Sequence, residues 1–389
     1  KSLAPPAGAA GGKLKSIYMV KTYYPHWGKH TAFNAFGGYF DRRKFKIKMR
    51  NVPMGDEKFR LPFVKGYWRR RTAENRVQEY KLNDLWTEMS LFAGSVFKKI
   101  DIIHLLDAEH TLMFLPGWFK KFRHLKKFPK IIAMFHQPPQ VLEPIINMDI
   151  VKQVDSVVVV SPTQAEFFEQ FLPPQRIRTI LLGVDTGHFK PNSLRRVRTF
   201  LKKGSDTSKN FCSAASRQAG QKKFLCLGGG VWLRDYEAIF KTAALLQKEP
   251  QIEFHLVAPE KIEHPALGNI FFHENITDAE LLELYRSCDI LFLPMQDATA
   301  NTFLLEGCAC GLPVVSSGLE SIRAYFPGPE AVLVKDNDPA LFVETILRLK
   351  NNPPELAEMS FHARQRALAL SWESIVKEYE DLYMNIGKN

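Results

Sequence analysis

Cysteine is scarce in this chain, and the few cysteines present lack the spacing of a metal or redox site. No two are arranged as Cys-x-x-Cys, so we expect neither a zinc site nor a redox-active pair. Most lie in apolar stretches, which favours buried thiols in a reducing cytoplasm over disulfides. The five are Cys212, Cys226, Cys288, Cys308 and Cys310.

Long apolar segments are also missing. No run of eighteen apolar residues occurs among the 389, so we expect no segment that spans a bilayer. Residues 1–12 lack the apolar core of a signal peptide and are interpreted as a flexible leader or an expression remnant. We therefore predict a cytoplasmic protein.

Acidic residues are scarce in the first half of the chain and common in the second. Residues 1–192 hold 31 Lys and Arg against 16 Asp and Glu, and residues 193–223 hold 9 against 1. Residues 224–371 reverse the balance, with 11 basic against 20 acidic residues. The formal net charge of +12 is therefore concentrated in the first half. This asymmetry predicts that the first half faces an anionic surface or acceptor.

What is present is a repeated alternation of short apolar segments and amphipathic ones. A length of 389 residues suits two domains, and 45% hydrophobic with 24% charged residues is typical of a globular protein. The alternation predicts two α/β domains, each with a doubly wound parallel sheet. Expected strands lie at residues 16–20, 45–52, 101–106, 130–135, 155–160, 223–227, 252–257 and 289–293.

One long amphipathic helix is expected between the second and third strands. Residues 77–99 carry apolar side chains at helical spacing, which predicts a long amphipathic helix. Further helices are expected at residues 236–247, 278–286 and 372–385. The apolar residues of the long helix are Val77, Leu82, Leu85, Trp86, Met89, Phe92 and Phe97.

The alternation stops between the two halves. Residues 193–222 are rich in Ser, Gly, Lys and Arg, which predicts a basic interdomain linker. The expected domains are residues 1–192 together with the terminal helix 372–389, and residues 223–371.

Residues 301–315 form the most informative stretch. They indicate a polar loop, a short helix that ends at Gly311, and a buried strand that begins at Val314. Glu306 lies inside this helix among apolar neighbours, where a carboxylate needs a partner to offset its desolvation. In an α/β sheet, a loop that leads into a helix N-terminus beside a strand end is a common phosphate site.

Several segments, in order along nearly the whole chain, resemble family-4 glycosyltransferases. Each is weak alone, but together they are specific. The resemblance implies the GT-B fold, in which two Rossmann-like domains face each other across a cleft. It also implies transfer from a nucleotide-diphosphate sugar, with retention of anomeric configuration and without a bound metal or other cofactor; no Asp-x-Asp motif ends an expected strand. The segments are residues 161–164, 176–191, 289–294, 301–315 and 371–379.

The resemblance assigns donor-binding roles in the second domain. Glu306 would accept hydrogen bonds from the ribose hydroxyls, because an ionised carboxylate offers two acceptor oxygens. Arg234, after the glycines at 228–230, would neutralise the diphosphate and act in catalysis. Gly229 and Gly230 would let the backbone approach the ligand closely.

The donor loop departs from the family in one respect. The family usually has a second Glu eight positions before Glu306, where this chain has Ala298, with Asp297 beside it. We expect the backbone around Asn301 and Thr302 to contact the sugar or diphosphate instead.

Across the cleft, the resemblance places two segments of the first domain. The loop after the first strand would lie beneath the donor phosphates, with Gly28 giving close approach and Lys29 or His30 adding a cation. His136 follows a strand and precedes two prolines, so it faces the crevice at a strand end. In the family this histidine lies near the acceptor and the transferred sugar; ordinary packing at the strand end is the alternative.

Other assignments are less specific. Glu274 precedes the helix where the nucleotide base packs in the family, and Glu320 lies one strand after Glu306. Residues 112–128 combine aromatic and basic residues, the composition of a helix on an anionic membrane. The same pattern fits a helix packed on a sheet with a solvated, charged face.

The predicted function is transfer of a sugar, from a UDP-sugar by preference, to a glycan or lipid-linked acceptor. We expect no nucleic-acid partner, and a location in the cytoplasm or at the inner face of the plasma membrane. Two alternatives remain: a non-catalytic GT-B protein that binds nucleotide sugars or serves assembly, and a sugar-nucleotide epimerase of the same fold.

Overall fold

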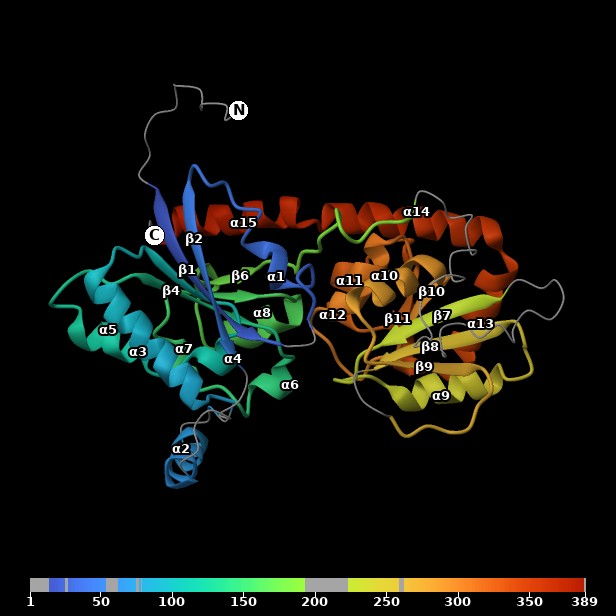
Figure 1. Ribbon diagram of the computed structural model, residues 1–389, viewed down its shortest axis with the longest axis horizontal. Helices are drawn as coiled ribbons and strands as arrows, with labels where there is room; N and C mark the ends of the chain where they lie inside the picture. Colours follow the sequence, from blue (N-terminus) through green and yellow to red (C-terminus); the bar gives the residue numbers. More distant parts are fainter. Residues whose placement is uncertain are drawn as a thin grey trace.

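The computed structural model describes residues 14–24, 27–53, 62–74, 77, 79–192, 223–258 and 262–387. These residues form two lobes, each built on a six-stranded parallel sheet (Figure 1). The predicted leader and the predicted basic linker at 193–222 lie outside the described residues. None of the helices in the described ranges is long and apolar enough to span a membrane.

The first sheet has the strand order β2-β1-β3-β4-β5-β6, and every neighbouring pair is parallel. Its central strands are short and buried along their whole length, as expected for a sheet covered by helices on both faces. The strands are β1 (Lys15–Tyr23), β2 (Phe45–Pro53), β3 (Ile102–Leu105), β4 (Lys130–Phe135), β5 (Ser156–Val159) and β6 (Ile177–Thr179).

Helices cover the first sheet and form its loops. They are α1 (Phe33–Phe36), α2 (Pro62–Glu74), α3 (Leu82–Phe97), α4 (Ala108–Thr111), α5 (Leu115–Phe122), α6 (Pro139–Leu142), α7 (Met148–Val151), α8 (Pro162–Glu169) and the 3-10 turn η1 (Pro174–Arg176).

The second sheet has the order β12-β11-β10-β7-β8-β9, again all parallel. Its strands are β7 (Phe224–Gly229), β8 (Ile252–Ala258), β9 (Ile270–Glu274), β10 (Ile290–Leu293), β11 (Val314–Ser317) and β12 (Ala331–Val334). Its helices are α9 (Tyr236–Leu245), α10 (Asp278–Ser287), α11 (Thr302–Ala309), α12 (Glu320–Tyr325), η3 (Lys335–Asn337), α13 (Pro339–Asn351) and α14 (Pro353–Ala369).

Strand order reverses once in each sheet. In the first sheet this switch lies between β1 and β3, and in the second it lies between β7 and β10. Ligands of open α/β sheets bind outside the carboxyl ends of the strands at such switch points. The fold therefore directs attention to the loops that follow β1, β3, β7 and β10.

The last helix returns to the first lobe. Helix α14 packs on the second lobe, whereas α15 (Trp372–Asn385) lies along the first (Figure 1). The Lys15 Nζ donates to the Tyr383 carbonyl at 2.6 Å, and the Tyr383 hydroxyl contacts His104 Nδ1 at 2.6 Å. Ser371 forms a backbone bridge with Val184 just before α15 begins. The chain thus crosses between the lobes a second time near residue 370.

The predicted long helix is present as α3, but three of the seven apolar residues named for it are exposed. The helix begins at Leu82 rather than at Val77, and Trp86, Met89 and Phe97 are exposed. Its buried face includes Glu88, which accepts hydrogen bonds from the backbone N–H groups of residues 113, 114 and 115 and from the Tyr80 hydroxyl. These backbone groups include donors at the start of α5 that have no partner within that helix, so the carboxylate must face inward.

Residues 112–128 were interpreted either as a helix on an anionic membrane or as a helix packed within the protein. In helix α5 the apolar side chains pack within the protein. Leu115 and Phe119 are buried, and Trp118 and Phe122 pack against Phe92 of α3 at ring-centre distances of 5.7 and 5.4 Å. The aromatic residues of α5 therefore belong to a helix–helix contact, while its lysines face outward.

Candidate active site

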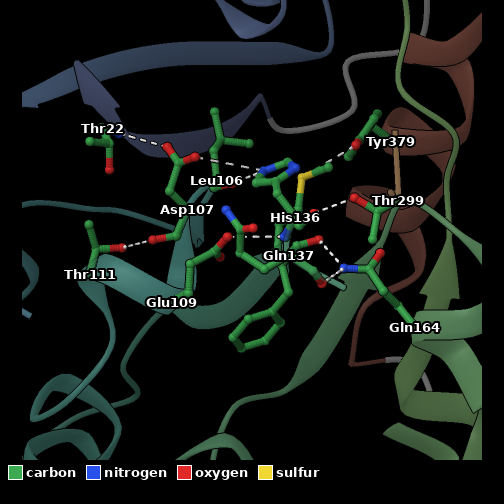
Figure 2. Close-up of polar contacts among 12 residues, drawn as sticks. Thr22, Leu106, Asp107, Glu109, Thr111, His136, Gln137, Gln164, Thr299 and Tyr379 are labelled. Atoms are coloured by element: carbon green, nitrogen blue, oxygen red, sulfur yellow. Dashed lines mark hydrogen bonds and ion pairs between the residues drawn. The ribbon is translucent and has the colours of Figure 1, made fainter. Parts of the chain in front are cut away.

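Loops from both lobes meet where the two sheets present their strand ends. The Thr299 hydroxyl, from the loop after β10, donates to the His136 carbonyl, which follows β4 (Figure 2). The Trp232 Nε1 donates to Gln137 Oε1 at 3.0 Å. His136 therefore lies directly against the 297–302 loop of the second lobe, although the two are more than 150 residues apart in sequence.

Glu306 is buried in α11 on the second lobe. Its Oε2 accepts a hydrogen bond from the Tyr285 hydroxyl at 3.0 Å, and its Oε1 has no hydrogen-bond partner. Burial raises the pKa of Glu306 to about 7, against the effect of the nearby hydroxyls of Thr31 and Tyr285. A buried carboxylate oxygen without a partner is costly, so this atom is well placed to accept a hydrogen bond from a ligand.

The loop after β1 reaches across to the second lobe. A Cβ on Gly28 would lie 2.0 Å from the Asp278 carboxylate of α10, so the backbone of this loop closely approaches the start of α10. Thr31 is close enough to Glu306 to affect its pKa. The loop after β1 thus lies beside α10 and α11 of the second lobe.

The two cations predicted in this loop differ in their surroundings. Lys29 is exposed. His30 Nδ1 lies 2.6 Å from Asp185 Oδ2, and the imidazole stacks on His188 with ring centres 3.9 Å apart. His30 is therefore engaged within the first lobe.

The glycine loop after β7 is shaped around Arg234. The Arg234 Nε donates to the Gly229 carbonyl and Nη1 donates to the Trp232 carbonyl, both at 2.9 Å. Gly230 has a φ of 86°, and a Cβ there would lie 2.9 Å from Arg234 Nη2. Burial lowers the pKa of Arg234 to about 10, so the group remains a cation at neutral pH, held at the switch point.

The N-terminus of α11 supplies backbone donors beside this cation. The Asn301 side chain caps the helix by accepting from the Leu304 N–H at 3.0 Å, so it is engaged within the loop. Thr302 begins the helix, where backbone N–H groups have no intrahelical partner and favour anions. Asp297 Oδ1 accepts from the Ala298 N–H at 2.7 Å, and burial raises the pKa of this carboxyl.

The His136 ring is held by two acceptors. Its Nε2 is 2.5 Å from the Leu106 carbonyl and 3.8 Å from Asp107 Oδ1 (Figure 2). A carbonyl only accepts, so Nε2 carries a hydrogen and donates it. The ring thus has the fixed orientation that a residue contacting substrate requires.

Two carboxylates that the sequence analysis did not single out support this histidine. Asp107, after β3, accepts from the Thr22 backbone N–H at 2.7 Å, and Glu109 accepts from the His136 backbone N–H at 3.2 Å (Figure 2). Glu109 is fully buried, and its Oε2 has no hydrogen-bond partner. Burial raises the pKa of Glu109 to about 7. Their position just after a strand at a switch point was the signal that could have identified them.

The two remaining predicted residues lie at the periphery. Glu274 is exposed at the end of the edge strand β9, and Glu320 is exposed at the start of α12. A hollow of about 350 Å³ beneath α5 contains none of the predicted site residues.

Within the described residues, no group of three or more His, Cys, Asp or Glu side chains is arranged to hold a metal ion. An Asp-x-Asp sequence does follow a strand that the sequence analysis missed, β12. Asp338 of this sequence caps α13, and Asp336 is exposed beside Lys335.

Comparison with known proteins gives matches to glycosyltransferases. Residues 221–352 match the family model described as "Glycosyl transferases group 1". The D-inositol 3-phosphate glycosyltransferase of Thermomonospora curvata is 25% identical over 234 residues, which cover 54% of this chain and 52% of that protein. The protein of the same name from Streptosporangium roseum is 22% identical over 324 residues, which cover 75% of this chain and 71% of that protein. The chain thus spans only about half the length of the Thermomonospora curvata protein, and 61% and 52% of the length of two further curated relatives.

Solved structures of low sequence identity share the whole architecture. Starch synthase IV from Arabidopsis thaliana, bound to ADP and acarbose, has a TM-score of 0.68 at 12% identity, covering 97% of this chain and 100% of that one. Sucrose-phosphate synthase from Thermosynechococcus elongatus has a TM-score of 0.66 at 15% identity, covering 95% and 98%. Anabaena HepE, in complex with UDP and glucose, has a TM-score of 0.65 at 11% identity, covering 96% and 100%.

These comparisons confirm two predictions. The resemblance to family-4 glycosyltransferases is confirmed by the matched family model together with the curated relatives. The chain has the GT-B fold, with two Rossmann-like sheets facing each other, as the solved structures show.

Proposed function

We propose that this chain is a retaining glycosyltransferase that uses a nucleotide-diphosphate sugar, by preference a UDP-sugar, as donor. The observation that carries the proposal is the buried Glu306, whose partnerless Oε1 lies at the switch point of the second sheet. The matched family model covers the same lobe.

Glu306 would bind the ribose of the donor. Two adjacent hydroxyls donate to a carboxylate better than a single one does, because each of its oxygens accepts independently. The pKa of about 7 in the unliganded site falls once these donors arrive, since hydrogen bonds favour the ionised form. Hydrogen bonds from the donor ribose would thus offset the desolvation of the buried Glu306 carboxylate.

Arg234 and the N-terminus of α11 would hold the diphosphate. As the bond between the sugar C1 and the phosphate oxygen breaks, negative charge accumulates on the leaving group. A cation and oriented backbone N–H groups stabilise that charge. Lys29, exposed on the facing loop, would add a second cation.

His136 would contact the transferred sugar and the acceptor. It faces the donor loop through the bond from Thr299, and its ring is oriented by Leu106 and Asp107. In the proposed reaction the acceptor oxygen bonds to C1 on the face from which the phosphate leaves, and the acceptor proton passes to the departing phosphate oxygen. No separate carboxylate base is needed, and no metal or other cofactor is proposed.

The acceptor we propose is a glycan or a lipid-linked glycan, used in the cytoplasm. The excess of 31 basic over 16 acidic residues in positions 1–192 favours an anionic acceptor over a neutral one. The test is a transfer assay that compares phosphorylated or lipid diphosphate-linked acceptors with their neutral counterparts at two salt concentrations.

Donor hydrolysis separates the proposal from its alternatives. Incubated with UDP-sugars without acceptor, a transferase slowly releases UDP, a binding protein releases none, and an epimerase returns an altered sugar nucleotide. The assay should be run after a thermal-shift screen of UDP-, GDP-, ADP- and dTDP-sugars, which identifies the donor. If none of these sugar nucleotides raises the melting temperature, the proposal is wrong.

A further inference from the structure

Helix α3 carries its large apolar side chains on the outside. Trp86 is 63% exposed and Phe97 is 85% exposed, and Met89 and Val96 are exposed between them. Residues three, seven and eleven positions apart lie along one side of a helix, so these side chains form a stripe. We call this stripe, Trp86, Met89, Val96 and Phe97, the α3 outer face.

The outward orientation of this stripe is fixed by the opposite side of the helix. Glu88 is fully buried and accepts four hydrogen bonds, three of them from backbone N–H groups around the start of α5. Turning α3 to bury Trp86 would expose those donors and leave the Glu88 carboxylate without its partners. The exposure of the stripe is therefore built into the first lobe.

The surface around the α3 outer face is basic and has almost no acidic residues. Lys98 and Lys99 are exposed at the end of α3, and Lys120, Lys121 and Lys127 are exposed on α5 and the turn after it. No Asp or Glu occurs in residues 89–100 or in residues 110–142. The two acidic residues of α3, Asp84 and Glu88, are both buried.

The apolar stripe and the basic residues belong to one surface. Lys126 Nζ donates to the carbonyls of Ser95 and Val96 at 2.5 and 3.1 Å, which ties the turn after α5 to the end of α3. Leu125, next to that lysine, is exposed as well. Figure 1 shows α3 and α5 side by side on the first lobe, at the end away from the second lobe.

We propose that the α3 outer face docks on an anionic lipid bilayer. Trp86 and Phe97 would enter the boundary between headgroups and acyl chains, while the surrounding lysines contact lipid phosphates. Exposed aromatic residues beside exposed lysines are the features of peripheral membrane binding. The proposal concerns where the protein docks, and it stands whether or not the reaction proposed above is correct.

A second copy of the chain fits this surface less well. A symmetric dimer would place the same patch on both sides of the interface, so the lysines of one copy would face those of the other. A bilayer of negative charge offsets these lysines instead. The inference therefore commits to lipid.

Vesicle co-sedimentation of the whole chain tests the proposal. Wild-type protein should bind vesicles of phosphatidylcholine and phosphatidylglycerol and bind pure phosphatidylcholine vesicles far less. The double variant Trp86→Ser/Phe97→Ser should lose binding about tenfold or more, and Lys98→Ser/Lys99→Ser should lose about tenfold. High salt should release most of the bound wild-type protein.

Matched variants on the second lobe serve as controls. Phe361 is 60% exposed on α14, and Lys248 and Lys335 are exposed. Phe361→Ser and Lys248→Ser/Lys335→Ser should bind vesicles like wild type, and all variants should keep the wild-type melting temperature. Equal binding to both vesicle types, or unchanged binding by the Trp86/Phe97 variant, would overturn the proposal. So would a wild-type dimer in solution that the Trp86/Phe97 variant dissociates.

Discussion

The two sides of the cleft each hold a buried glutamate in the same chemical state. Glu306 on the second lobe and Glu109 on the first are both buried and each has one carboxylate oxygen without a hydrogen-bond partner. Burial raises the pKa of each to about 7. Glu306 was predicted from the sequence and Glu109 was not.

This difference shows that a site can be predicted from sequence when the residues that form it are contiguous. Glu306 lies in a contiguous stretch where loop, helix and strand follow one another within fifteen residues. The role of Glu109 becomes visible only through its hydrogen bond with the backbone N–H of His136. That residue lies 27 positions later in the sequence and directly follows the next strand, β4. In the proposed reaction Glu306 would contact the donor directly, whereas Glu109 would position His136, which would contact the transferred sugar. The following experiments separate these two roles.

The largest effect is expected from Glu306→Gln. The variant should bind the donor nucleotide or turn it over at least tenfold less well, because charged hydrogen bonds to ribose become neutral ones, a loss of about 1.5–3 kcal/mol. Isothermal titration with the identified donor measures this, and circular dichroism checks the fold. Unchanged affinity and rate would remove Glu306 from the donor site.

His136→Ala should affect turnover more than nucleotide affinity. The ring is held by Leu106 and Asp107, and the proposal places it on the acceptor side. Its loss should therefore lower kcat about tenfold or more with a nearly unchanged dissociation constant for the nucleotide. Wild-type kinetics in this variant would show that the ring only packs at the strand end.

Glu109→Gln should resemble His136→Ala in kind but be weaker. An amide oxygen can still accept from the His136 N–H, so we expect a loss of kcat of about threefold, with donor affinity unchanged. The pH profile of kcat should flatten near pH 7, where the carboxyl of wild type titrates. A change in donor affinity instead would place Glu109 on the donor side and break the comparison.

Arg234→Ala should raise the donor KM and lower kcat by a few-fold each. In the proposed reaction the Arg234 cation would contact the diphosphate, whose negative charge increases as the bond to the sugar breaks. Arg234→Lys is the matched control, because it keeps the charge and loses the planar donors. Equal loss in both variants would indicate that shape, through the bonds to Gly229 and Trp232, matters more than charge.

The smallest effect expected is that of Glu306→Gln on stability. A higher melting temperature would indicate that Glu306 serves ligand binding, and a lower one that it serves the structure. The folded pKa of Glu306, about 7, lies above its ordinary value of 4.5. Its contribution to stability is therefore present below pH 4.5 and is lost as the pH rises through 7. Without donor, Glu306→Gln should raise the melting temperature at pH 8, and it should do so less at pH 5. The control variant Glu283→Gln, at an exposed position, should leave the melting temperature unchanged at both pH values.

Most of the fold could be predicted because its strands are short, apolar and buried on both faces. Helix α2 and strands β6, β9 and β12 were not predicted; β6 has only three residues, two of them exposed, and every residue of β9 except His273 is exposed or half-buried. The apolar spacing of α3 did not reveal which of its faces is buried, because Glu88 must cap the start of a different helix. Apolar spacing records which residues are hydrophobic, but not which polar group the interior requires.

The site was predicted where neighbours in sequence are neighbours in space. Glu306, Gly230 and Arg234 lie in two such segments at one switch point. His30 was expected to serve as a cation for the donor, yet it is paired with Asp185, 155 residues away. Long-range pairs of this kind leave no local pattern, and only the folded chain reveals them.

The return of α15 to the first lobe has a consequence for how such proteins can be rearranged. The second lobe lies between two crossings of the chain. One lies near residues 186–190, whose carbonyls accept hydrogen bonds from Arg286 and Arg364 of the second lobe, and the other lies near Ser371. Exchanging the second lobe for that of another protein would therefore require two cuts. A single cut at residue 370 would leave the recipient without the helix that Lys15 and His104 contact. A recombination event that replaces only the second lobe must therefore insert an internal segment of chain. The first lobe of the recipient keeps both its own N-terminal part and its own α15.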